Sequence, residues 1–197
     1  MRKVFLVLLA FIGLQVVNAQ GFSFIPKAGV NISTLTNSAG SDARVGLNIG
    51  LGVEKEVANS FALESGLFYS MQGVKFGDVT VKLDYINIPV LAKYYVTENF
   101  SVFAGPQLGV NVNSSTKASF GGISGTVDID DVVKTFDVAL NLGLGYQFEQ
   151  GLFLSASYSN GLIGVFKSGV LVGQHFDITG EKNSNNIVFS VNVGWKF

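Results

Sequence analysis

The chain has 197 residues, a formal net charge of −1 and a charged fraction of 14%, well below the roughly 25% of soluble globular domains. It contains no cysteine, which excludes disulfides and thiolate chemistry. Its charges form no basic patch or stripe, so we expect no nucleic-acid partner. The mean hydropathy is +0.40, yet beyond the N-terminus no apolar run reaches the roughly 18 to 20 residues of a spanning helix. High apolarity without such a helix favours β-structure that contacts something other than water.

Residues 1–19 are predicted to be a secretory signal peptide. Two basic residues precede an apolar run from Val4 to Val17, which ends in a small-residue cleavage site at Ala19. Cleavage there removes two of the 13 basic residues and leaves 11 against 14 acidic ones. An N-terminal membrane anchor is the alternative, but a run of about 14 residues is short for one. We therefore expect a single mature domain over 20–197.

Hydrophobicity alternates with period two along most of this domain, as expected for strands with one apolar and one polar face. The stretch 137–149 shows the pattern best, because Ala139, Asn141, Gly143 and Gly145 alternate with larger apolar side chains. The apolar face of this stretch carries Val138, Leu140, Leu142, Leu144, Tyr146 and Phe148.

Such segments predict about eight strands, joined alternately by tight turns and by longer connections. The tight turns are 58–60, 97–99 and 150–151, and the longest loops are expected at 114–133 and 161–185. Short turns at one end and long loops at the other indicate an all-β, antiparallel, up-and-down transmembrane β-barrel. The expected strands are 22–33, 43–57, 61–74, 83–96, 100–113, 134–149, 152–160 and 186–197.

The direction of the apolar face separates a membrane barrel from a soluble lipocalin-like barrel. If the apolar face pointed inward, the exterior would be a weakly charged surface of Gly, Asn and Ser, which is poorly solvated. If it points outward, the membrane band must be free of charge, because Lys or Arg there costs about 2 to 4 kcal/mol. The strands have no charge at those positions, so we expect contact with membrane lipid and location in the bacterial outer membrane.

Aromatic residues of outward parity gather near the short turns and the C-terminus, where a membrane-interface girdle belongs. They are Phe61, Tyr94, Phe100, Tyr146, Phe148, Trp195 and Phe197. Glycines of inward parity fit the narrow bore of an eight-stranded barrel, and curvature of the sheet is an alternative reason for them. Pro89 and Pro106 fall inside predicted strands, so we expect a bulge or a local break there, with a slip of parity by one residue.

Four charged residues of inward parity lie toward the short turns: Lys27, Glu54, Glu64 and Lys93. We predict that they pair as a plug in the bore. The alternative is that they project into periplasmic water and pair only weakly. A plugged barrel of this size conducts solutes poorly, because its interior is just wide enough to be filled by side chains.

With these features assembled, the sequence resembles the PorT-like outer-membrane β-barrel domain family of the Bacteroidetes. The resemblance spans the mature chain, and its motifs describe strand geometry rather than chemistry. Asn87 replaces a usual glutamate and Ser157 stands where a basic residue is common, which weakens any lumenal ion pair that the resemblance implies. A few members of that family act in secretion, which the resemblance allows here. The stretches that carry it are PKAGVNISTL (26–35), DYINIPVLAKYY (84–95), VFAGPQLGV (102–110) and SYSNGL (157–162).

Sites for catalysis, metals and cofactors are weakly supported. The single histidine, His175, lies in a predicted loop, and the chain has no G-x-S-x-G elbow, so we expect no enzyme activity. Asp128, Asp130 and Asp131 form an acidic cluster that offers part of an oxygen shell for Ca²⁺, but EF-hand spacing is absent. We expect neither a cofactor nor a dedicated metal site.

The sequence thus favours a non-enzymatic barrel that acts in interaction, assembly or secretion through its loops or periplasmic rim. The alternative is a narrow pore or conduit for small or lipophilic solutes. The loop 161–185 is more apolar than a solvated loop requires, so we expect it to offer a strand edge or apolar patch to a protein partner.

Overall fold

The computed structural model describes residues 21–38, 40–120, 123–167 and 184–197. The expected signal peptide at 1–19 and His175 both lie outside these residues. Within the described part of the chain, no helix is long and apolar enough to cross a membrane.

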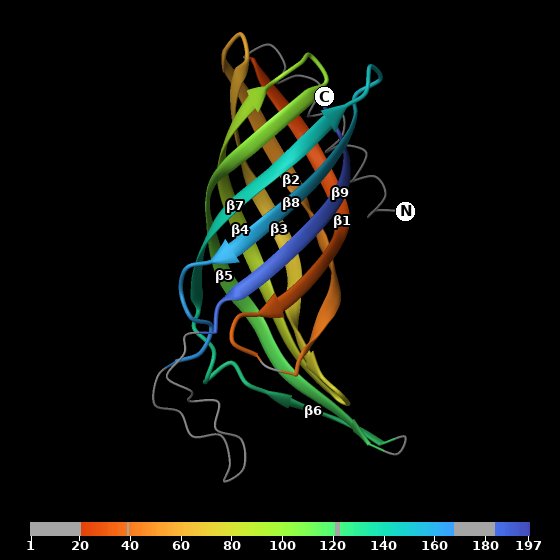
Figure 1. Ribbon diagram of the computed structural model, residues 1–197, viewed down its shortest axis with the longest axis vertical. Coiled ribbons are helices and arrows are strands. Elements are labelled where there is room, and N and C mark those ends of the chain that lie inside the picture. Colours follow the sequence, from red (N-terminus) through yellow and green to blue (C-terminus); the bar gives the residue numbers. More distant parts are fainter. Residues whose placement is uncertain (1–20, 39, 121–122, 168–183) are drawn as a thin grey trace, which may run out of the picture.

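The described residues form an antiparallel barrel whose strands wind steeply around a common axis (Figure 1). Neighbouring strands pair in the order β4-β3-β2-β1-β9-β8-β7-β5-β6, and an additional β4–β5 pairing closes the ring. Eight strands close the barrel, which confirms the predicted fold, and β6 lies outside the ring as an extension of β5. The strands are β1 Phe22–Leu35, β2 Asp42–Ala58, β3 Phe61–Phe76, β4 Val79–Tyr95, β5 Phe100–Phe120, β6 Ile123–Asp128, β7 Phe136–Gln147, β8 Leu152–Gly161 and β9 Asn186–Trp195.

The period-two pattern becomes an outward apolar face and a buried inward face. In β7, Leu140, Leu142 and Leu144 are 52%, 54% and 50% exposed, whereas Asn141 is 8% exposed. The same contrast holds in β1, where exposed Val30 and buried Asn31 are neighbours. A soluble monomer rarely exposes an apolar band of this extent to water, whereas a membrane barrel covers such a band with bilayer hydrocarbon.

The connection expected at 114–133 contains strand structure that the sequence pattern did not predict. β5 continues to Phe120 and forms a hairpin with β6, in a register that runs from Ser115↔Asp128 to Phe120↔Ile123. The hairpin projects beyond the barrel at the end opposite the C-terminus (Figure 1). Both faces of such an extension meet water, so its sequence lacks the contrast that marks a membrane strand.

The two prolines interrupt the ladder without shifting it. Between β4 and β5 the described pairs pass from Pro89↔Gln107 directly to Ala92↔Ala104, so two pairs are missing while both strands advance by the same count. Between β3 and β4 the pairs likewise pass from Ser65↔Val90 to Phe68↔Asn87. The expected local break is therefore present, and the expected slip of parity is wrong. A register shift occurs instead at Asp84/Tyr85.

The bore is filled by more than small polar residues. Near the short turns, Ile25, Phe103 and Phe153 are buried on inward positions. At the loop end, buried apolar residues form a cluster that we call the apolar cap. It consists of Leu35, Val74, Leu83, Tyr85, Val133 and Val165, all 6% exposed or less.

Candidate functional site

Charged side chains from four neighbouring strands meet inside the barrel close to the short turns. Glu54 of β2 and Glu64 of β3 are directly opposed in the ladder, an arrangement that repels when both carry charge. Lys93 of β4 resolves this repulsion because its Nζ pairs with Glu54 and lies 2.8 Å from Glu64 Oε2. Lys27 of β1 pairs with the other oxygen of Glu64. The four residues singled out in the sequence are thus in mutual contact.

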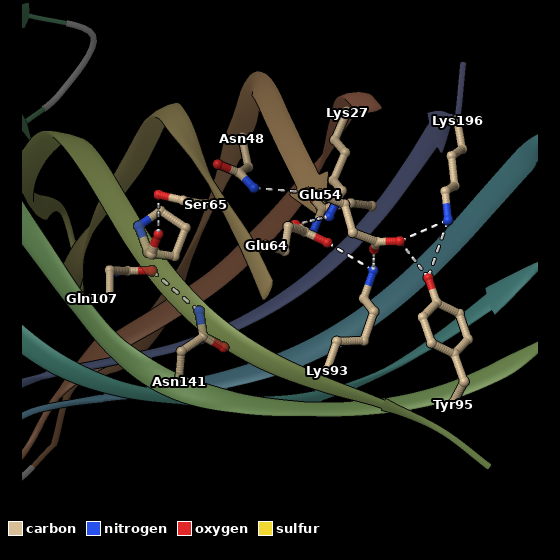
Figure 2. A network of polar contacts seen from close by, with 12 residues as sticks. Lys27, Asn48, Glu54, Glu64, Ser65, Lys93, Tyr95, Gln107, Asn141 and Lys196 are labelled. Carbon is tan, nitrogen blue, oxygen red and sulfur yellow. Dashed lines mark hydrogen bonds and ion pairs between the residues drawn. The ribbon is translucent and has the colours of Figure 1, made fainter. Parts of the chain in front are cut away.

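Two further residues join this group, and the sequence prediction missed both. Lys196, which follows β9, places its Nζ 2.6 Å from Glu54 Oε1. Tyr95 donates its hydroxyl to the same oxygen at 2.6 Å. Both have inward parity, so strict use of the period-two rule at the strand ends would have found them. We call these residues the charged network (Figure 2): Lys27, Glu54, Glu64, Lys93, Tyr95 and Lys196.

The charged network is almost completely withdrawn from solvent. Lys93, Glu54 and Glu64 are 0%, 1% and 2% exposed. The ring of Phe153 lies beneath both inner lysines, 4.7 Å from Lys93 Nζ and 4.9 Å from Lys27 Nζ, so a cation–π contact adds to each ion pair. Buried charges are tolerated only when partners satisfy them, and here each one has at least one opposite charge. The arrangement is suited to closing the bore rather than to activating a nucleophile.

A second polar group lies toward the loop end. Arg44 and Asp84 approach to 3.7 Å, and Tyr69 donates its hydroxyl to Asp84 Oδ2 at 2.9 Å. Asn113 donates to the same oxygen at 3.0 Å. Asp84 therefore ties β2, β3 and β5 to β4 at the register shift described above.

The aromatic residues proposed as a girdle lie at the short-turn end. Five of them are between 40% and 50% exposed. Phe61 and Tyr94 are ladder partners with ring centroids 4.8 Å apart, and Tyr146 and Phe148 form an edge contact at 4.9 Å. Their exposure and position favour an interfacial role, which stays a prediction.

The acidic cluster is dispersed among local contacts. Asp130 Oδ1 accepts the Ser114 amide at 2.7 Å, which leaves this carboxylate engaged in the fold. Lys167 Nζ donates to the backbone carbonyl of Asp131 at 2.9 Å. Among the described residues, no group of three or more acidic, histidine or cysteine side chains is placed to hold a metal ion.

The described ends of the 161–185 loop fold back over the barrel mouth. Val165 is 3% exposed within the apolar cap, and Phe166 forms a bridge with Val133. Some apolar content of this loop therefore packs on its own chain. The stretch 168–183 of the predicted partner-binding loop lies outside the described residues.

Comparisons with known proteins agree with this architecture. Neisserial surface protein A (NspA) is similar in structure, with a TM-score of 0.53 and 15% identity over 90% of this chain and 98% of that chain. The attachment invasion locus protein Ail of Yersinia pestis has a TM-score of 0.51 and 16% identity over 90% and 99% of the respective chains. At these identities the likeness concerns the fold. No curated protein matches the chain.

A family model described as "Outer membrane protein beta-barrel domain" matches residues 18–167. That match covers most of the chain and all of the charged network except Lys196. The outward apolar face and the closed ring of strands are what such a domain needs in a bilayer. The protein therefore belongs to the outer membrane protein beta-barrel domain family and is located in the outer membrane.

Proposed function

We propose that the protein is a non-enzymatic interaction barrel that captures an extended protein segment outside the membrane along the edge of β6. The observation that carries this proposal is the position of β6 at the end of the sheet order. Among the described residues it pairs with β5 alone, so its second edge presents unpaired backbone groups. Such an edge binds an extended segment by adding it as a further strand.

The surface chemistry of β6 supports the same role. Gly125 to Asp128 are exposed, and Val127 is 66% exposed on a hairpin that projects away from the barrel. An isolated apolar side chain on an open edge gives a bound strand a cross-strand contact as well as hydrogen bonds. Long extracellular segments are where barrels of this class meet other molecules, since the short turns face the periplasm.

The alternative function, a narrow pore, finds less support. The charged network fills the bore near the short turns, and the apolar cap fills it near the loops. An eight-stranded ring leaves little room around such side chains. The geometry therefore favours a barrel that acts through its surface.

The motifs noted in the sequence resemble those of the PorT-like barrels, some of which act in secretion. A role in assembly or secretion fits a barrel that holds a passing or resident extended chain. The loop 161–185 supplies a second candidate contact, because its sequence is more apolar than a solvated loop requires.

Cysteine crosslinking in intact cells tests the β6 edge, since the chain itself contains no cysteine. We expect a Thr126→Cys variant to capture a defined partner, and an Asn59→Cys variant, on the opposite end, not to capture it. Adding Asp128→Pro should abolish capture from position 126, because the register with β5 turns the Asp128 N–H toward the open edge and proline removes that donor. Capture that is equal at both positions, or unchanged by the proline, would reject the β6 edge.

Deletion of 168–180 tests the loop separately, because it leaves Val165 available to the apolar cap. If the loop is the contact, the deletion variant should lose capture of the partner but should still fold, as shown by heat-modifiable migration in detergent gels. Unchanged capture would leave β6 as the contact and remove the loop from consideration.

A further inference from the structure

Gly125 lies in the interior of β6, although neither the backbone nor the packing of the hairpin requires a glycine there. Its φ is outside the left-handed region, and a Cβ added at this position would meet no atom within 4 Å. Glycine weakens the interior of a strand, because it loses more conformational entropy on folding and packs no side chain. A glycine that the fold does not need, on an open strand edge, therefore marks a place where another chain can approach closely.

The residues beside Gly125 in the neighbouring strands form an apolar row whose side chains become smaller toward the open edge. Gly125 pairs with Ala118 of β5. Ala118 pairs with Val79 of β4, which in turn pairs with Phe76 of β3. Paired residues of neighbouring strands share a face of the sheet, so the row descends from phenylalanine through valine and alanine to bare backbone. Phe76, Val79 and Ala118 are half-buried, whereas Gly125 is exposed. We call this apolar edge the Gly125 step.

The hydrogen-bond pattern of β6 determines how closely an added strand would approach this step. The Ile129 amide donates to the Ser114 carbonyl at 3.0 Å. Because the pattern alternates along an antiparallel pair, the backbone groups of Gly125 point toward β5 and those of Thr126 point to the open edge. In an antiparallel added strand, the residue opposite Gly125 is thus in a non-hydrogen-bonded pair, in which the Cα atoms are only about 4.5 Å apart. A large side chain at that residue would lie across the glycine and contact Ala118.

The opposite face of β6 presents a negative charge. Asp128 is exposed, and among the residues that the structure describes it takes part in no ion pair. Lys117 lies diagonal to it in the β5–β6 ladder without pairing. Opposite charges that face each other directly across two strands stabilise the pair, so a basic residue in the added strand would complement Asp128. In an antiparallel strand, this basic residue comes three positions before the residue opposite Gly125.

We propose that the protein segment captured at β6 adds as an antiparallel strand with an aromatic side chain over the Gly125 step and a basic side chain opposite Asp128. The aromatic ring covers the glycine backbone and Ala118 and removes both from water. The basic residue fixes the register, because a shift by one position turns it to the other face. This inference rests on the proposed capture at the β6 edge and specifies the chemistry of the captured segment.

Synthetic peptides of one strand length test this chemistry on the folded protein in phosphatidylcholine vesicles. The peptides share an alternating serine and threonine sequence, with tryptophan or alanine at one position and arginine or glutamate three residues earlier. Fluorescence anisotropy of a label on each peptide gives its dissociation constant. We expect the tryptophan peptides to bind about tenfold more tightly than the alanine peptides, because the ring loses apolar surface to the step. Arginine should improve binding about threefold over glutamate.

Filling the step should remove the preference for tryptophan. In Gly125→Val, the tryptophan and alanine peptides should bind equally, and the alanine peptides should keep their affinity because the backbone edge is unchanged. Gly125→Ala should give an intermediate preference and provides a second variant if valine disturbs the hairpin. Thr126→Val is the matched control, because it changes the opposite face and should keep the preference for tryptophan. Asp128→Asn should remove only the preference for arginine. Heat-modifiable migration in detergent gels shows that each variant is folded.

The experiment separates this inference from the capture on which it rests. If tryptophan and alanine peptides bind the unaltered protein equally, or if the preference survives Gly125→Val, the inference about the Gly125 step is overturned while capture at β6 stands. If no peptide binds and Thr126→Cys captures no partner in cells, the capture itself is overturned and this inference with it.

Discussion

Leu142 of β7 and Ser157 of β8 lie within one strand spacing of each other but face different surroundings. Leu142 is 54% exposed on the outward face, whereas Ser157 lines a polar pocket in the bore. Leu142 pairs with Tyr158, and Ser157 pairs with Gly143, so the two positions lie in adjacent pairs of the β7–β8 ladder. The identity of the solvent on each side therefore decides which substitutions these positions accept.

We expect Leu142→Arg to lower the free energy of unfolding by about 2 to 4 kcal/mol, because hydrocarbon cannot solvate the guanidinium. Ser157→Arg should cost less, since that side chain enters a polar wall that includes Glu64. Urea unfolding of barrels in lipid vesicles measures both values. A barrel that accepts arginine better at position 142 than at 157 would have the opposite face toward lipid.

Lys93 is the residue on which the charged network depends most. It is 0% exposed and contacts both glutamates, so Lys93→Met leaves the opposed Glu54 and Glu64 without their shared counter-charge. Breaking a buried pair in this way costs about 3 to 5 kcal/mol.

Lys196→Met is the matched control, because the Lys196 side chain is 12% exposed and Glu54 retains Lys93 as a partner. In urea unfolding, the free energy of unfolding should fall clearly less for Lys196→Met than for Lys93→Met. Equal losses would show that the network does not have Lys93 at its centre.

The long ladders of β4 with β3 and with β5 are both interrupted beside Pro89. Ser65 compensates for part of this defect, because its hydroxyl donates to the Pro89 carbonyl at 2.8 Å (Figure 2). This bond explains a polar residue between the exposed Leu63 and Leu67 on the outward face of β3.

Ser65→Ala should therefore destabilise the barrel by about 1 to 3 kcal/mol, the penalty for an acceptor that loses its partner in an apolar medium. Ser65→Thr keeps the hydroxyl and should remain close to the unmodified protein. The comparison uses the same urea assay. An alanine variant as stable as the threonine variant would mean that the hydroxyl contributes nothing.

The membrane-facing part of the fold was predictable because lipid and lumen impose opposite demands on alternate residues. That contrast gave the eight strands and the inward parity of Lys27, Glu54, Glu64 and Lys93. It disappears in the β5–β6 hairpin, where both faces meet water, and the hairpin was missed. Parity also does not reveal how far a side chain reaches, so neither the convergence on Lys93 nor the buried Phe153 followed from the sequence.

A closed ring of strands has no edge from which unfolding can begin. We expect the protein to fractionate with the outer membrane and to migrate anomalously in detergent gels unless it is boiled. Recovery from the soluble periplasmic fraction, with migration unchanged by heating, would contradict the membrane barrel.

Closure of that ring has a kinetic consequence. β1 pairs with β9, and the hydrogen bond from Ser190 to Asn31 joins residues 159 positions apart. Loop-closure entropy opposes so distant a contact until the intervening strands have aligned. Until then the growing sheet carries two open edges, each able to pair with another chain. Pairing of β1 with β9, the last step of assembly, therefore removes both open edges. Before that step the nascent sheet needs shielding by a binding partner or by the membrane itself.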